Sequence, residues 1–173
     1  EFYFLCFLVV CFIISSYEWF KICKTKSQKF FGLLLLIFSF ISAFYIRNEI
    51  GGDYFYFITI LFICISTDVG GFVFGKTLKG PKLTKISPNK TYSGMFGGYI
   101  LSLTFIYIYI SNYNSIVNYL NINEVKDLKI INLYLFTLII SSTSQIGDIS
   151  ISYFKRLSKI KNTGNIIPGH GGL

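Results

Sequence analysis

The chain has 173 residues, of which 53% are hydrophobic, 19% aromatic and 14% charged. Soluble domains carry about a quarter charged residues, so this composition excludes an ordinary soluble domain and favours an integral membrane protein. The formal net charge of +8 fits an orientation signal and attraction to anionic lipid headgroups, and we expect no nucleic-acid partner from it.

Five apolar segments are expected to cross the membrane as α-helices, over residues 2–20, 30–46, 54–74, 93–111 and 130–147. Each is roughly 17–21 residues long, which is the length that a helix needs to cross a hydrocarbon core about 30 Å thick. Helices are required because lipid cannot satisfy open backbone groups. The predicted fold is therefore all-α: one polytopic transmembrane helix bundle over residues 1–173, with a cytoplasmic helix and loop over residues 148–173.

Basic residues collect in alternate loops of this arrangement. Thirteen of the sixteen follow the first, third or fifth segment. The positive-inside rule assigns these loops to the cytoplasm and places the visible N-terminus outside. Because the sequence starts at Glu1 and stops at Leu173 after a glycine-rich run, we expect it to be a fragment of a longer protein.

Two carboxylates, Asp68 and Asp148, lie toward the cytoplasmic ends of apolar segments. A carboxylate within the membrane costs about 2.5–3.5 kcal/mol on insertion scales, so it usually faces the bundle interior and has a function. The alternative is a side chain that extends to the interface or pairs with a lysine. Both interpretations stay open at this point.

Glycines follow Asp68 and recur after the next loop. The pair Gly71 and Gly75 and the pair Gly94 and Gly98 have GxxxG spacing, which is typical of closely packed helices. A compatible interpretation is that Gly70 and Gly71 let a ligand phosphate, or its metal, approach the backbone.

The loop over residues 76–91 contains five lysines and the run Ile-Ser-Pro-Asn-Lys-Thr. A loop that only orients the protein would need the charge but not this pattern of proline and hydroxyl residues. The hydroxyls of Ser87 and Thr91, with the ammonium of Lys90, form a plausible cradle for phosphate oxygens.

A polar patch over residues 141–145 precedes Asp148, and such a patch is unsuited to a lipid-facing surface. If the helix continues past Asp148, this carboxylate shares one stripe with Ser152, Lys155 and Lys159. The alternative is an amphipathic surface helix with solvated lysines.

The final stretch holds Pro168 and three nearby glycines around the only histidine, His170, which predicts a tight loop. A zinc site would need more His or Cys ligands. Two carboxylates with many lysines and hydroxyls suit Mg²⁺ and phosphate better.

Two longer blocks carry a resemblance. Residues 68–98 read DVGGFVFGKTLKGPKLTKISPNKTYSGMFGG, and residues 144–173 read SQIGDISISYFKRLSKIKNTGNIIPGHGGL. The first is similar to D-x-G-A-Y-x-x-G-(R/K) followed by K-x-S-P-x-K-T-(W/Y)-x-G. The second resembles S-x-x-K-R-x(4)-K-D-x-G-x(2)-(L/I)-P-x-H-G-G. These are signatures of the phosphatidate cytidylyltransferases, also called CDP-diacylglycerol synthases, and the blocks cover about a third of the chain.

The resemblance implies transfer of a cytidylyl group from CTP to phosphatidate at the cytoplasmic face of the inner membrane, with Mg²⁺ as cofactor and a homodimer as a further expectation. It assigns the metal to Asp68, Asp148 and Asn162. The residues expected to act in catalysis are Asp148, Lys155, Arg156, Lys161 and His170. Those expected to bind substrate are Gly70, Gly71, Ser87, Lys90, Thr91, Ser144, Ser152, Gly171 and Gly172.

The sequence departs from the family pattern at three places. Asn162 stands where the signature has Asp, which keeps one oxygen ligand but removes a negative charge. Gly71 and Phe72 replace the usual Ala and Tyr, and the closing Asp-Arg-x-Asp is absent. The alternatives are a CTP-dependent polyprenol kinase, a CDP-archaeol synthase type of enzyme, a transporter or structural membrane protein, and an inactive truncated homologue.

Overall fold

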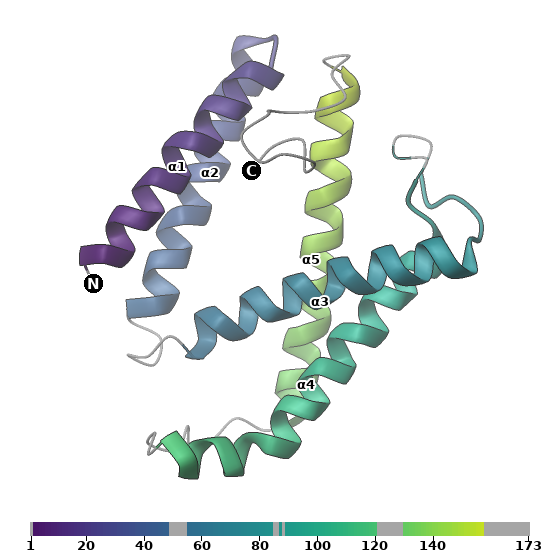
Figure 1. Cartoon of the computed structure of the whole chain (residues 1–173). Coiled ribbons are helices and arrows are strands. Elements are labelled where there is room, and N and C mark those ends of the chain that lie inside the picture. Colours follow the sequence, from purple (N-terminus) through teal and green to yellow (C-terminus); the bar gives the residue numbers. More distant parts are fainter. Residues whose placement is uncertain (1, 49–54, 85–86, 88, 121–129, 158–173) are drawn as a thin grey trace. The chain divides into compact units, whose positions relative to one another are not determined.

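The computed structural model describes residues 2–48, 55–84, 87, 89–120 and 130–157 (Figure 1). These residues form five α-helices: α1 (Phe2–Ile22), α2 (Lys26–Asn48), α3 (Phe55–Leu78), α4 (Tyr92–Leu120) and α5 (Ile130–Leu157). The only extended pairing in this part of the chain is an isolated antiparallel bridge between Lys82 and Thr91. The prediction of an all-α membrane protein is confirmed.

Four of these helices, α1 to α4, are long and apolar enough to cross a membrane. In the described part of the chain, α5 is not among these candidate spans. Its middle carries the polar patch over residues 141–145, which precedes Asp148. The fifth membrane span therefore remains a prediction.

Helix boundaries differ from the predicted ones where capping residues extend a helix beyond its apolar run. α2 begins at Lys26, before the apolar run, because Thr25 and Gln28 form a capping box. The backbone amide of Gln28 donates to Thr25 Oγ1 over 3.3 Å, and the backbone amide of Thr25 donates to Gln28 Oε1 over 3.4 Å. At the other end of the chain, α5 continues unbroken through Asp148 to Leu157, which is the condition on which the predicted stripe depends.

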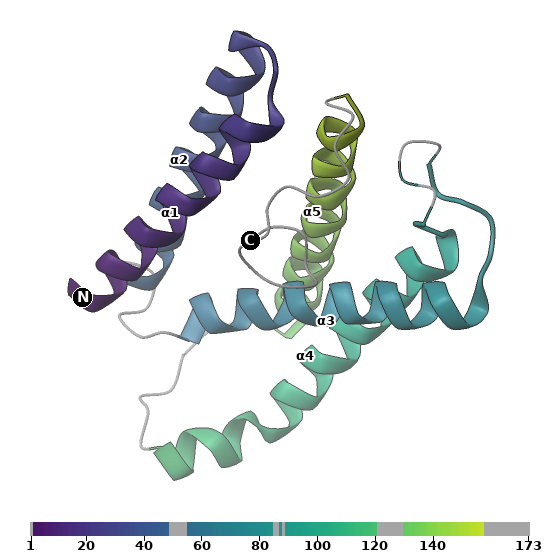
Figure 2. The same cartoon turned by 45° about the horizontal axis from the view of Figure 1, so that its top comes forward.

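The chain divides into two compact units. The hairpin unit comprises residues 1–58 and 150–173, and the crossing unit comprises residues 59–149. In the hairpin unit, α1 and α2 lie side by side, as both cartoon views show (Figures 1 and 2). The Trp19 indole, which is 7% exposed, covers Gly32, donates to the Gln28 carbonyl over 3.2 Å and meets the Phe154 ring edge-on at 5.0 Å.

Replacement of Gly32 by alanine is expected to displace the Trp19 indole, because a Cβ atom at this position would overlap the indole ring. Overpacking of this kind destabilises a protein by about 1–3 kcal/mol. Trp19 is the only tryptophan in the sequence, so its fluorescence emission reports the change directly. A Leu35→Ala variant, at a side chain 65% exposed on the same helix, is the control. Unchanged emission from Gly32→Ala would contradict the contact.

In the crossing unit, α3 crosses α4 where glycines of the two helices meet (Figure 2). A Cβ on Gly70 would overlap the carbonyl of Gly97, and a Cβ on Gly94 would lie 2.7 Å from the carbonyl oxygen of Gly71. Because neither contact leaves room for a side chain, the two backbones touch directly. The close-packing interpretation of the glycine spacing is confirmed.

The first part of α5 packs against this crossing through polar groups. Thr67 Oγ1 donates to Ser141 Oγ over 3.0 Å, and both residues are at most 1% exposed. The Tyr99 and Ser142 hydroxyls are 2.9 Å apart. Interhelical hydrogen bonds of this kind are worth about 0.6–2 kcal/mol in membranes. The polar patch thus faces neighbouring helices at these positions, as its composition predicts.

Candidate active site

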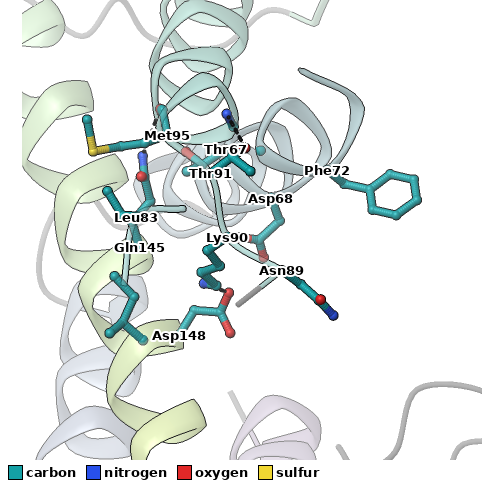
Figure 3. A pocket seen from close by; sticks show the side chains of 13 residues that line it. Thr67, Asp68, Phe72, Leu83, Asn89, Lys90, Thr91, Met95, Gln145 and Asp148 are labelled. Carbon is teal, nitrogen blue, oxygen red and sulfur yellow. Dashed lines mark hydrogen bonds and ion pairs between the residues drawn. The ribbon is translucent and has the colours of Figure 1, made fainter. Parts of the chain in front are cut away.

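A cavity of about 400 Å³ opens in the crossing unit, where α3, the 79–91 loop, the start of α4 and α5 come together (Figure 3). Its polar lining includes both carboxylates singled out from the sequence, Asp68 from α3 and Asp148 from α5. Lys90, from the loop, lies at the same cavity. Groups separated by up to 80 positions in the sequence are therefore gathered in one site.

Lys90 and Asp148 form an ion pair across the cavity. The side chain of Lys90 is 25% exposed and that of Asp148 is 58% exposed, so water screens the pair in part. Asp68 lines the same cavity (Figure 3) and interacts electrostatically with both Asp148 and Lys90. The site thus holds two acidic side chains and one basic side chain, and Lys90 directly contacts one of the two carboxylates, that of Asp148.

The loop before α4 holds Lys90 in place through its own backbone. The Leu83 amide donates to the Lys90 carbonyl over 2.7 Å, and the Lys90 amide donates to the Ser87 carbonyl over 3.0 Å. Tyr92 closes the loop by donating to the Pro81 carbonyl over 3.1 Å. These bonds fix the loop backbone and leave the Lys90 side chain to reach into the cavity.

Thr91 caps the N-terminus of α4 at the edge of the cavity. Its Oγ1 accepts a hydrogen bond from the Gly94 amide over 3.1 Å and lies 2.9 Å from the Ser93 hydroxyl. A threonine in this role satisfies an amide that the helix cannot pair itself. The start of a helix also presents a partial positive charge, which favours an anion next to it.

The other predicted site residues lie in several places. Gly71 lines the cavity, whereas Gly70 is buried against Gly97. Ser87 contributes its backbone to the loop, and Ser144 lies beside Cys64. Ser152, Lys155 and Arg156 belong to the end of α5 in the hairpin unit. Five further predicted residues lie outside the described residues: Lys161, Asn162, His170, Gly171 and Gly172.

Three polar residues at the cavity were not predicted from the sequence: Thr67, Asn89 and Gln145. Gln145 precedes Asp148 by three positions, which places the two on one helix face and is a signal that spacing alone supplies. Its Nε2 donates to the Met95 carbonyl over 3.4 Å, which joins α5 to α4 next to the carboxylate. In the sequence, only its position next to Lys90 suggests that Asn89 belongs to the site.

The donor set of the cavity fits a hard divalent cation. Mg²⁺ binds oxygen ligands and typically uses one or two carboxylates together with water and substrate phosphates. Asp68 and Asp148 supply two carboxylates at one cavity. Within the described ranges, no group of three or more His, Cys, Asp or Glu side chains that could hold a metal ion is found.

Fold and site together define a helical membrane protein whose cavity suits a metal ion and phosphate. The chain belongs to the cytidylyltransferase family, whose sequence profile matches residues 29–173. The resemblance found in the sequence motifs is thereby confirmed.

Three relatives are named phosphatidate cytidylyltransferase. The protein of Rickettsia bellii is 37% identical over 99% of this chain and 72% of its own length. That of Staphylococcus haemolyticus is 33% identical over 96% of this chain and 60% of its own length. That of Bacillus subtilis is 38% identical over 66% of this chain and 40% of its own length. The chain thus spans about two fifths to three quarters of the length of these relatives.

Proposed function

We propose that this chain acts as a nucleotidyltransferase that moves a cytidylyl group from CTP to phosphatidate. The products are CDP-diacylglycerol and pyrophosphate. The family and the names of its relatives support this function. The observation that carries it is the cavity at which Asp68 of α3, Asp148 of α5 and Lys90 of the loop lie together.

In the proposed reaction, a phosphate oxygen of phosphatidate attacks the α-phosphorus of CTP. A new P–O bond forms, and the bond to the β-phosphate breaks so that pyrophosphate leaves with the electron pair. Phosphate groups have a second pKa near 6, so the attacking oxygen is already ionised near neutral pH and needs no strong base. Both reactants are anions, and the first task of the site is to neutralise their charge.

The residues of the cavity suit this task. Lys90 presents a flexible ammonium that can contact phosphate oxygens, and the capped start of α4 adds a partial positive charge. Asp68 and Asp148 would hold Mg²⁺, which supplies charge neutralisation and alignment of phosphate oxygens in reactions of this type. Phosphoryl-type transfers depend mainly on positioning and electrostatics, which a rigid crossing of helices provides.

The proposed location is the inner membrane, with the site facing the cytoplasm. The end of α3 and the loop that follows it carry five lysines over residues 76–90, which the positive-inside rule assigns to that side. The anionic headgroup of the lipid would meet the cavity at this boundary while its acyl chains stay in the membrane. A homodimer remains a prediction.

The test is a transfer assay in vesicles that contain phosphatidate, with CTP labelled on either the α- or the γ-phosphate. We expect the α-label in the lipid fraction and release of pyrophosphate. Vesicles without phosphatidate are the control and should take up no label. Incorporation of the γ-label with release of CDP would contradict the proposal and identify a lipid kinase.

A further inference from the structure

The ion pair between Lys90 and Asp148 joins two groups that the proposed function uses separately. Lys90 would contact phosphate, and Asp148 would hold the metal, yet in this structure the two side chains pair with each other. We propose that Lys90 is the resident counter-ion of Asp148 and exchanges this carboxylate for a substrate phosphate when the divalent cation enters. This inference rests on the proposed function, because it concerns the same cavity.

The surroundings of the pair favour such an exchange. The backbone on both sides of Lys90 is tied to Leu83 and Ser87, so the loop can stay in place while the four-carbon stem of Lys90 swings. Figure 3 shows this stem reaching toward Asp148 from the loop. The pair is partly exposed, and exposed pairs change an equilibrium by at most about fivefold, so a phosphate can displace the carboxylate.

Because of Asp68, the preferred partner of Lys90 depends on whether the cation is bound. Asp68 interacts electrostatically with both Asp148 and Lys90. Without a ligand, Lys90 offsets part of the repulsion between two carboxylates at one cavity. A divalent cation supplies that charge itself and then repels the lysine, whereas a phosphate attracts it. Binding of the cation and binding of the phosphate are therefore mutually favourable, and Lys90 disfavours the cation while phosphate is absent.

Lys82 is a matched control in the same loop. It carries the same charge and is exposed. It precedes Leu83, which lines the cavity, and its backbone pairs with Thr91 in extended geometry. Lys82 itself does not line the cavity. Removing its charge tests the general effect of a positive charge in the loop.

The experiment measures binding of Mn²⁺ alone to the purified protein in detergent, by electron paramagnetic resonance and without nucleotide. Lys90→Gln is expected to bind Mn²⁺ about twofold to fivefold more tightly than the unmodified chain. Lys90→Arg, which keeps the pair, and Lys82→Gln should match the unmodified chain. Equal affinities for all four proteins, or equal tightening by Lys82→Gln, would overturn the counter-ion role.

A second measurement covers the case in which Lys90→Gln fails to fold. Amine acetylation of Lys90, followed by mass spectrometry, should be about twofold to fivefold faster in Asp148→Asn than in the unmodified chain. Equal rates would overturn the inference. The transfer assay on the unmodified chain separates the two proposals. Tighter Mn²⁺ binding by Lys90→Gln, together with no cytidylyl transfer by the unmodified chain, would leave the counter-ion role standing and refute the activity. Absence of Mn²⁺ binding in every variant would refute both the metal assignment and the exchange.

Discussion

Replacement of Asp148 by alanine is expected to abolish CDP-lipid formation while the protein still inserts into the membrane. The carboxylate lines the cavity with Asp68 and pairs with Lys90, so its loss removes one of the two carboxylates proposed to hold the metal and leaves the lysine charge unbalanced. Removal of one electrostatic group from an active site lowers turnover by about a hundredfold or more. The measurement is transfer of α-labelled cytidylyl to phosphatidate in vesicles, normalised to inserted protein.

The control is Thr143→Ala on the same helix. Thr143 is exposed, and its hydroxyl donates only within its own helix, to the Ile139 carbonyl over 3.0 Å and the Ile140 carbonyl over 2.8 Å. This variant should keep near-normal transfer. Near-normal transfer by Asp148→Ala would refute the assignment of the metal to this carboxylate.

Replacement of Gly70 by alanine is expected to destabilise the crossing unit by about 1–3 kcal/mol, because overpacking forces the backbone to shift. The added Cβ would meet the Gly97 carbonyl, and backbone cannot move aside as a side chain can. The free energy of unfolding in mixed micelles, measured by circular dichroism during denaturant titration, gives the change.

Gly147→Ala provides the matched control for this substitution. A Cβ on Gly147 has no heavy atom within 4 Å in the described structure, so the same chemical change meets open space. Alanine is a better helix former than glycine by about 0.5–1 kcal/mol, so the control should be neutral or slightly stabilising. If Gly70→Ala unfolds at the same denaturant concentration as the unmodified chain, the close contact between α3 and α4 is wrong.

Much of the fold follows from local signals in the sequence. The apolar runs predict α1 to α4 because their length and composition are set by the thickness of the bilayer. The glycine spacing predicts a close helix contact, and the Thr25 and Gln28 pair is a capping box that the sequence alone contains. The end of α5 is harder to predict, because the polar residues near Asp148 permit either a continued helix or a new one.

The candidate site is less accessible from sequence. Chemistry and motif resemblance select Asp68, Asp148 and Lys90, but the pairing of the lysine with Asp148 depends on how the loop backbone folds onto itself. Gln145 and Ser144 are adjacent polar residues, and only the rotation of α5 decides that Gln145 meets the cavity while Ser144 lies beside Cys64. Rotation about a helix axis is set by tertiary packing, which no local pattern encodes.

The glycine crossing has a consequence for how the site responds to heat. Asp68 stands less than one turn before Gly70 on α3, and Lys90 stands two residues before α4, whose Gly94 touches Gly71. Because no side chains separate the two backbones, a slide of one helix along the other would also move Asp68 away from Lys90. Thermal inactivation and loss of helix packing should therefore have the same midpoint temperature. We expect no temperature range in which the protein is folded but inactive.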